Sequence, residues 1–212
     1  MAGAIEKVVR LKIELCDLDP PVWRRVAVPA DFPLRRLHDV IQAVFCWLGG
    51  HLHQFEVDDR IYCRSEFAGA GFGLARRYSD RNTTLGALVE RGSERFVYRY
   101  DFGDDWEHVV TVERVEAPQA GVEYPVLLDG AWRAPPEDCG GPPGFEAFLE
   151  VLADEAHDEH EDLMDWYGGP FDPDDMELEV VEAMLGRIRA GRRKGPAKGS
   201  RSSSKKVGTK TR

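Results

Sequence analysis

The densest group of metal-binding side chains lies between Tyr98 and Glu113, in the run YRYDFGDDWEHVVTVE. Within eight positions this run places four carboxylates and one imidazole, side chains that bind divalent metals. They are Asp101, Asp104, Asp105, Glu107 and His108, with Trp106 among them. A structural role is the alternative: the aspartates would accept hydrogen bonds from the amides of a turn, with Trp106 and His108 in the core.

Two further histidines, His51 and His53, are two residues apart in the run HLHQFEV. Side chains at this spacing on a strand point to the same face, which can present two imidazoles to one metal. With His108 and one carboxylate of the acidic turn, they would leave an open position for a water molecule, whose pKa a bound zinc lowers to about 7. Such a site would belong to a metal-dependent hydrolase. A surface or turn role for both histidines is the alternative, because no third ligand is close in the sequence.

The loop from Pro135 to Gly144, PPEDCGGPPG, is a second candidate segment, rigid at its prolines and permissive at its glycines. It carries Asp138 and Cys139. An exposed thiol here could act as a nucleophile if a histidine from elsewhere activated it, although no local signature supports such a pair. The four cysteines of the chain include no CxxC spacing, which favours reduced thiols over a zinc ribbon or a disulfide framework.

Alternating hydrophobic residues predict the strands that would position these groups. Residues 9–15 alternate apolar and charged side chains, and residues 22–28 resume an extended pattern. The acidic turn joins two more such runs in a hairpin, at residues 96–100 and 106–112. Further extended segments are expected at 51–57, 60–63 and 124–128. Arg24 and Arg25 are expected on a solvated strand face, with a phosphate-binding pair as the alternative.

Hydrophobic residues recurring every three or four positions predict a helix from Leu34 to Leu48, ended by Gly49 and Gly50. Shorter helices are expected at 84–91, at 145–153 and in the acidic segment 154–167. A last helix begins at Asp172 or Asp174 and ends at Gly191. With 212 residues and 42% hydrophobic side chains, the chain fits one domain with a sizeable core.

Charge is distributed unevenly along the chain, whose formal net charge is −10. Residues 191–212 hold nine Lys or Arg and no Asp or Glu, so the body carries 19 basic against 38 acidic residues. Their low hydrophobic content predicts a domain over residues 1–190 and a disordered, basic Gly/Ser-rich tail over 191–212. An acidic body repels nucleic acid, whereas this tail attracts it. The candidate nucleic-acid contacts are Arg192, Arg193, Lys194, Lys198, Arg201, Lys205 and Lys206.

Membrane insertion is not expected. No stretch approaches 18 apolar residues, and the N-terminus begins with a strand pattern in place of an apolar signal core. We therefore expect a cytoplasmic protein.

Four segments, in this order, carry a family resemblance. They are PPVWRRVAV (20–28), LHDVIQAVFCWLGGHLHQF (37–55), YRYDFGDDWEHVVTVE (98–113) and PPEDCGGPPGF (135–145). Together they resemble the plasmid pRiA open-reading-frame-three-like family, a domain of plasmids and a passenger of insertion elements. With the acidic helix and FDPDDM, the resemblance spans nearly all of residues 5–185. It implies an α+β fold with a largely antiparallel or mixed sheet packed by several helices in a single domain, and no established activity.

Two positions depart from the pattern of that family. Ala134 stands where the family often has a cysteine, which weakens a two-cysteine metal or disulfide role for Cys139. Cys46 stands before Trp47, where the family usually has glycine, a change that we attribute to helix packing.

The expected function is that of an accessory or binding protein of this plasmid and transposon passenger family, in contact with nucleic acid or a protein partner. The alternative is a metal-dependent hydrolase with a His/Asp site and a divalent metal as its cofactor.

Overall fold

The structure, a computed structural model, describes residues 4–67 and 76–194. Its strands are β1 Val8–Leu15, β2 Trp23–Pro29, β3 His53–Val57, β4 Arg60–Cys63, β5 Arg76–Ser79, β6 Arg95–Tyr100, β7 Trp106–Glu116 and β8 Val126–Ala131. Its α-helices are α1 Leu34–Val44, α2 Leu85–Val89, α3 Gly141–Ala153, α4 His160–Tyr167 and α5 Leu178–Lys194, with a 3₁₀ turn at Ser65–Phe67.

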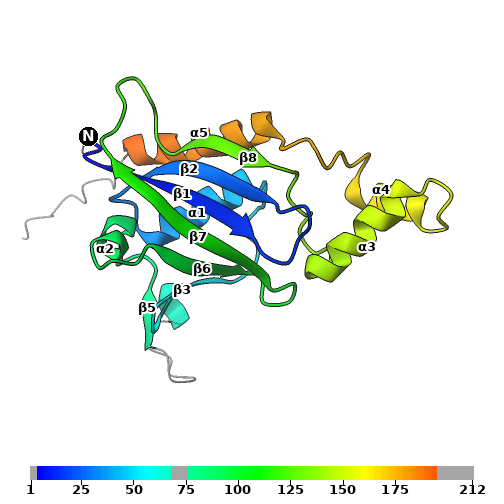
Figure 1. Ribbon diagram of the computed structural model, residues 1–212, viewed down its shortest axis with the longest axis horizontal. Helices are drawn as coiled ribbons and strands as arrows, with labels where there is room; N and C mark the ends of the chain where they lie inside the picture. The colour runs from blue at the N-terminus through cyan, green and yellow to red at the C-terminus, as the bar shows by residue number, and fades with distance from the viewer. Residues whose placement is uncertain (1–3, 68–75, 195–212) are drawn as a thin grey trace, which may run out of the picture.

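All eight strands form one open sheet in the order β5-β4-β3-β6-β7-β1-β2-β8 (Figure 1). Neighbouring strands are antiparallel except β4 and β5, which are parallel. The predicted α+β fold, a single domain with a mixed, largely antiparallel sheet, is confirmed. The hairpin of β6 and β7 occupies the middle of the sheet, so its turn emerges at one end of the sheet.

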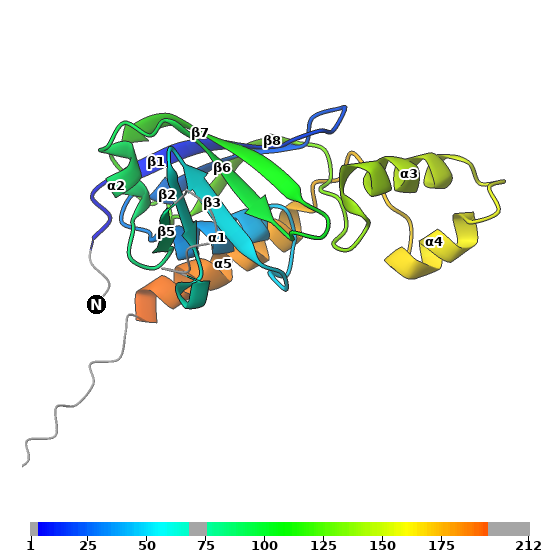
Figure 2. The same cartoon turned by 90° about the horizontal axis from the view of Figure 1, so that it is seen from below.

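Helices α1 and α5 lie side by side beneath one face of the sheet (Figure 2). The strand β1 shows why: Val9, Leu11 and Ile13 are fully buried, whereas the alternating charged residues between them are partly exposed. The buried side chains belong to the same cluster as Leu37 of α1 and Leu185 of α5. Removing these side chains from water is the main driving force for this layering.

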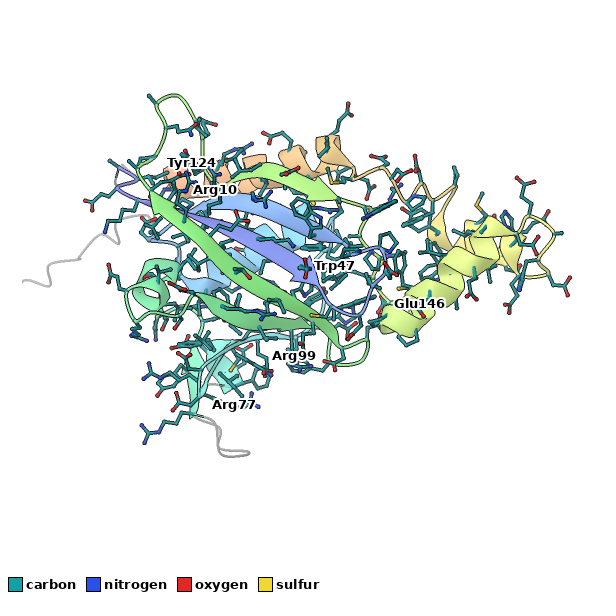
Figure 3. The ribbon with its side chains drawn as sticks, viewed as in Figure 1. Arg10, Trp47, Arg77, Arg99, Tyr124 and Glu146 are labelled. Carbon is teal, nitrogen blue, oxygen red and sulfur yellow. The ribbon has the colours of Figure 1, made fainter. Side chains whose placement is uncertain are left out.

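Helix α1 ends at Val44, four residues before the end expected from its sequence pattern. The backbone turns at Cys46, whose φ of 57° is left-handed. Glycine is the usual residue at such a helix end, because it has no Cβ to clash. The cysteine at this position therefore occupies a turn and not the packed helix surface that the sequence suggested. The turn directs Trp47 into the core, toward the end of the sheet from which α3 begins (Figure 3).

Arg24 is buried beneath the sheet, so its expected solvated position is wrong. Its Nε donates a hydrogen bond of 2.9 Å to the carbonyl oxygen of Val44, at the end of α1. Its Nη1 donates to the carbonyl oxygens of Trp23 and Ala131, both at 2.9 Å. Burial lowers the pKa of this guanidinium to about 10, still charged at neutral pH. Its neighbour Arg25 lies on the solvated face, as expected, and binds acidic side chains of β7 and β8.

Helices α3 and α4 form a hairpin that projects from one end of the sheet (Figures 1 and 2). Helix α5 continues to Lys194, beyond Gly191 where the sequence placed its end. Residues 195–212, the rest of the predicted tail, lie outside the described residues. In the part of the chain that is described, no helix combines the length and the apolar character needed to cross a bilayer.

The matched arginines of β2 provide a test of the fold. Arg24→Ala removes the donor to the buried carbonyl oxygen of Val44 and to the partly buried carbonyl oxygens of Trp23 and Ala131, so the free energy of unfolding should fall by about 3 kcal/mol. Arg25→Ala removes two solvated ion pairs, with Glu113 and Asp129, and should cost less than about 1 kcal/mol. Urea unfolding of both variants measures the difference. Equal losses in the two variants would contradict the role assigned to Arg24.

Candidate functional site

The turn between β6 and β7 is built by its aspartates. Asp101 and Asp105 both have a left-handed φ of 53°, a conformation that aspartate tolerates better than most residues. Asp101 Oδ1 accepts a hydrogen bond of 3.0 Å from the amide of Gly103. The amide of Asp105 donates back to the Asp101 carbonyl oxygen at 2.6 Å. The turn is therefore closed from within, which fixes the direction of its side chains.

The loop before α3 packs directly against this turn. The amide of Gly140 donates a hydrogen bond of 3.1 Å to Asp104 Oδ2. At Gly141, a Cβ atom would lie 2.4 Å from the carbonyl oxygen of Asp104, so only glycine fits. At the start of the loop, the indole of Trp47 donates to the carbonyl oxygen of Pro135 at 2.8 Å. Two distant anchors thus hold the loop in place.

The segment between α1 and β3 completes the junction. The amide of Leu48 donates a hydrogen bond of 2.9 Å to Glu137 Oε2, and the amide of Asp101 donates to the carbonyl oxygen of Leu52 at 2.9 Å. The amide of His51 lies 3.4 Å from the hydroxyl oxygen of Tyr100. Three segments that are far apart in the sequence therefore meet at one end of the sheet.

His51 lies at the centre of this junction, between two carboxylates. Its Nδ1 is 3.4 Å from Asp101 Oδ2, and its Nε2 is 3.3 Å from Asp138 Oδ1. Among the described residues, these three form the one group of three or more histidine, cysteine or acidic side chains whose ligand atoms all lie within 4.8 Å of one another. The Asp101 side chain is 12% exposed, that of His51 33% and that of Asp138 71%. Solvent and small ions therefore reach the Nε2 side of the imidazole more easily than its Nδ1 side.

This arrangement gives the two ring nitrogens different roles. Asp101, fixed by the turn, has its carboxylate 3.4 Å from Nδ1, and a carboxylate at this nitrogen favours the tautomer with the proton on Nδ1 and orients the ring. Nε2 then carries a lone pair that faces an oxygen of the exposed Asp138 at 3.3 Å, and a cation between these two atoms would relieve their repulsion. Asp101, His51 and the exposed Asp138 follow one another in this order. Such an arrangement can bind a divalent metal, or the carboxylates can hold the imidazole in position to act as a base.

His53 does not share this site with His51. The strand β3 begins at His53, so His51 lies outside the strand and the two-residue alternation does not relate the two side chains. The His53 ring is buried, with Nε2 at 3.1 Å from Asp80 Oδ2. It stacks on His38 with 3.7 Å between ring centroids. Burial lowers the pKa of His38, whose Nδ1 lies 2.7 Å from the hydroxyl oxygen of Tyr98.

His108 and Trp106 are buried in the core, as the structural alternative anticipated. The His108 Nδ1 lies 3.3 Å from the carbonyl oxygen of Tyr98. The edges of the Phe45 and Trp47 rings contact its ring, with centroid distances of 4.9 and 5.3 Å. Burial lowers the pKa of His108 to about 3, so the ring is neutral at physiological pH. The three histidines suggested by the sequence as one ligand set are thus separated, and only His51 reaches the acidic turn.

The remaining acidic residues of the turn have other partners. Asp104 binds the loop through Gly140, as described above. Asp105 accepts a hydrogen bond of 2.9 Å from Arg99, which also binds Glu56 and Glu107 on neighbouring strands. Of the three candidate aspartates in the turn, only Asp101 contacts His51.

Cys139 follows Asp138, and its thiol is poorly suited to nucleophilic attack. Burial and the nearby carboxylate of Asp104 raise the pKa of this thiol to about 12, so the thiolate is scarce at neutral pH. Its sulfur is free, as are those of the other three cysteines.

Tyr100 and Glu137 support the site and were missed by the sequence interpretation. The Tyr100 hydroxyl donates a hydrogen bond to Glu137 Oε1, and the Tyr100 ring packs edge-on against His51 at 5.7 Å. Burial, together with this bond, raises the pKa of Tyr100. The adjacent acidic residues of the PPEDCGG run were the available signal, since Glu137 directly precedes Asp138.

Comparison with known proteins identifies similar sequences and one similar structure. The family model described as plasmid pRiA4b ORF-3-like protein matches residues 7–180. A protein of Sinorhizobium fredii (strain NBRC 101917 / NGR234), named uncharacterized protein y4hQ, is 41% identical over 171 residues, which cover 77% of this chain and 82% of that protein. The crystal structure of a protein of unknown function, MM3350 from Methanosarcina mazei Go1, is similar with a TM-score of 0.74 and 35% identity. That match covers 81% of this chain and 96% of the other.

The buried His108 predicts a specific pH dependence. Its pKa falls from 6.5 in the unfolded chain to about 3 in the fold, so between these values only the unfolded chain binds the proton. The free energy of unfolding should therefore fall as the pH drops below 6.5, and this residue should have no effect above it. In His108→Phe the decline should be shallower by about 1 kcal/mol per pH unit.

Urea unfolding between about pH 7.5 and 4.5 measures this slope. The slope is the informative quantity, because the substitution also removes a hydrogen bond and changes the stability at every pH. His157→Phe, at an exposed histidine, is the control and should keep the slope of the original protein. An unchanged slope in His108→Phe would show that this ring is not held neutral by the fold.

Proposed function

The chain belongs to the plasmid pRiA4b ORF-3-like family, and we propose that its function depends on a divalent-metal centre at His51. The observation that carries the proposal is the placement of this imidazole between Asp101 and Asp138. His51 Nε2 and a carboxylate oxygen of Asp138 are the proposed ligands. Asp101 is a positioning residue that holds the ring through Nδ1.

The distance between His51 Nε2 and Asp138 Oδ1 supports a metal centre that could form with small side-chain movements. Zinc binds imidazole nitrogen and carboxylate oxygen at about 2.0–2.2 Å, which places two tetrahedral ligand atoms about 3.4 Å apart. Nε2 and Asp138 Oδ1 are already 3.3 Å apart. Catalytic zinc sites have three protein ligands and one open position, whereas these two ligands would leave the other positions to water, and zinc-bound water is acidic enough to act as a nucleophile. The proposed reaction class is therefore metal-assisted hydrolysis.

Metal titration of the protein tests this proposal. After removal of metals with a chelator, isothermal titration with zinc or manganese should show about one ion bound per chain. His51→Ala should abolish this binding. Asp101→Asn keeps the shape of the side chain and loses the charge, so affinity should fall about 10- to 100-fold. His157→Ala, which removes an exposed histidine before α4, is the matched control and should bind as the original protein does.

Binding that survives in His51→Ala, or an original protein that takes up no stoichiometric metal, would contradict the proposal. Hydrolysis of bis(p-nitrophenyl) phosphate by the metal-loaded protein, lost in His51→Ala, is the result expected of the proposed reaction class.

A second proposal assigns nucleic-acid contact to the C-terminal residues of an accessory protein acting on mobile DNA in the cytoplasm. It is supported by the six Lys or Arg and the absence of Asp or Glu in residues 195–212. Arg192 binds both carboxylate oxygens of Asp31 at 2.8 and 2.9 Å, so this exposed ion pair would have to open before Arg192 contacts nucleic acid. The other candidate contacts stay predictions: the Arg193 and Lys194 side chains and the whole of residues 195–212 lie outside the described residues.

Truncation after Lys194 tests the contact with nucleic acid. If about five cations displace counterions, the logarithm of the affinity for duplex DNA should fall with the logarithm of the salt concentration at a slope near −4.5. Fluorescence anisotropy between about 50 and 200 mM salt measures this slope. The truncated chain should show no binding, because the body that remains is strongly acidic. DNA binding by the truncated chain would place the contact in the body and reject the proposal.

A further inference from the structure

The exposed side chain of Trp166, on α4, separates two hollows in the surface. The first, of about 430 Å³, lies between α3 and α4, and Asp138 and Cys139 of the loop before α3 also line it. The second, of about 370 Å³, lies between α4, the segment after α1 and the start of α5. Trp166 lines both hollows, and 52% of its surface is exposed. We call this region the Trp166 surface.

Large apolar side chains are unusually exposed on the Trp166 surface. Leu48 and Val180 line the second hollow with Trp166, and they are 85% and 44% exposed. The buried Phe148 and the partly buried Leu163 form the apolar wall of the first hollow. Leaving Leu48, Trp166 and Val180 in water is costly, and an exposed apolar patch of this kind indicates a surface that a partner covers.

The charged side chains that line the two hollows, among the described residues, are all acidic, although one of them, Glu177, is paired with Arg133 at 2.6 Å. Asp138, Glu159 and Asp162 line the first hollow, and Glu137 and Glu177 line the second. No lysine or arginine lines either hollow in the described part of the chain. Within that part, the side chains of Glu159 and Asp162 also make no ion pair. A partner that covers this surface must therefore bring positive charge to avoid repulsion.

We propose that the Trp166 surface binds a basic, amphipathic peptide segment of a partner protein. Two apolar side chains of the peptide enter the hollows on either side of Trp166, while its Lys or Arg residues meet the carboxylates. Two neighbouring open hollows, divided by one aromatic ring, suit successive anchors of a peptide better than a single compact molecule. The α3–α4 hairpin, which carries Trp166, projects from one end of the sheet (Figures 1 and 2). This inference does not depend on a metal at His51.

Peptide binding to the full chain tests the inference. The probe is a fluorescein-labelled helical peptide of about 15 residues, with two leucines one helical turn apart among lysines. Fluorescence anisotropy should show saturable binding that Trp166→Ala weakens about tenfold or more. The pair Glu159→Gln and Asp162→Asn, at exposed positions that leave the fold intact, should weaken binding and reduce its salt dependence. Val115→Ala, at an exposed residue of β7 that lines neither hollow, should bind as the original protein does.

Three results would overturn the inference. One is equal affinity in Trp166→Ala and the original protein, both shown to be folded by circular dichroism. Another is equal binding of a peptide in which every lysine is replaced by glutamate. The third is a dimer in sedimentation velocity that Trp166→Ala dissociates, because the occupant of the surface would then be a second copy of this chain.

Discussion

The carbonyl oxygen of Asp104 leaves no room for a side chain at Gly141, where a Cβ atom would lie 2.4 Å away. This close approach, together with the bond from the Gly140 amide to the Asp104 carboxylate, joins the loop before α3 to the turn of the central hairpin. The loop carries Asp138, and the turn carries Asp101. Their positions on either side of His51 therefore depend on a backbone contact that tolerates only glycine. The hydrogen bond from Gly140 to Asp104 depends on the same contact.

Beneath this junction, aromatic and imidazole rings pack against one another in the core. Trp47 stacks on Tyr100 with 5.1 Å between ring centroids and meets the ring of His108 edge-on. The buried ring of His108 is neutral, because the fold offers it no compensating charge and burial penalises the protonated form. Such a ring packs as an aromatic side chain. The partly exposed His51 contacts the Tyr100 ring at the edge of this cluster, and both of its ring nitrogens face polar partners. Burial thus distinguishes His108, which packs in the core, from the partly exposed His51, whose ring nitrogens can contact polar groups.

Periodicity was sufficient to predict the central hairpin and most helices, since these depend on residues that are close in the sequence. Periodicity did not predict the position of a side chain where that position depends on a residue distant in the sequence. Arg24 was expected in solvent, but the carbonyl oxygens of Val44 and Ala131, one of them 107 positions away, satisfy its buried guanidinium. His51 and His53 were expected on one face, but β3 starts only at the second of them. The family resemblance indicated which segments matter, and the register and packing between these segments determine which of their side chains meet.

In the proposed centre, Asp101 orients His51 so that Nε2 and Asp138 hold a divalent metal. Crystals soaked in zinc test this arrangement, through an anomalous difference map recorded at the zinc absorption edge. We expect a peak about 2.0–2.2 Å from His51 Nε2 and from an oxygen of Asp138, with Asp101 still facing Nδ1. A map with no peak at this junction, or with zinc bound only to histidines elsewhere, would show that these residues do not form a metal centre.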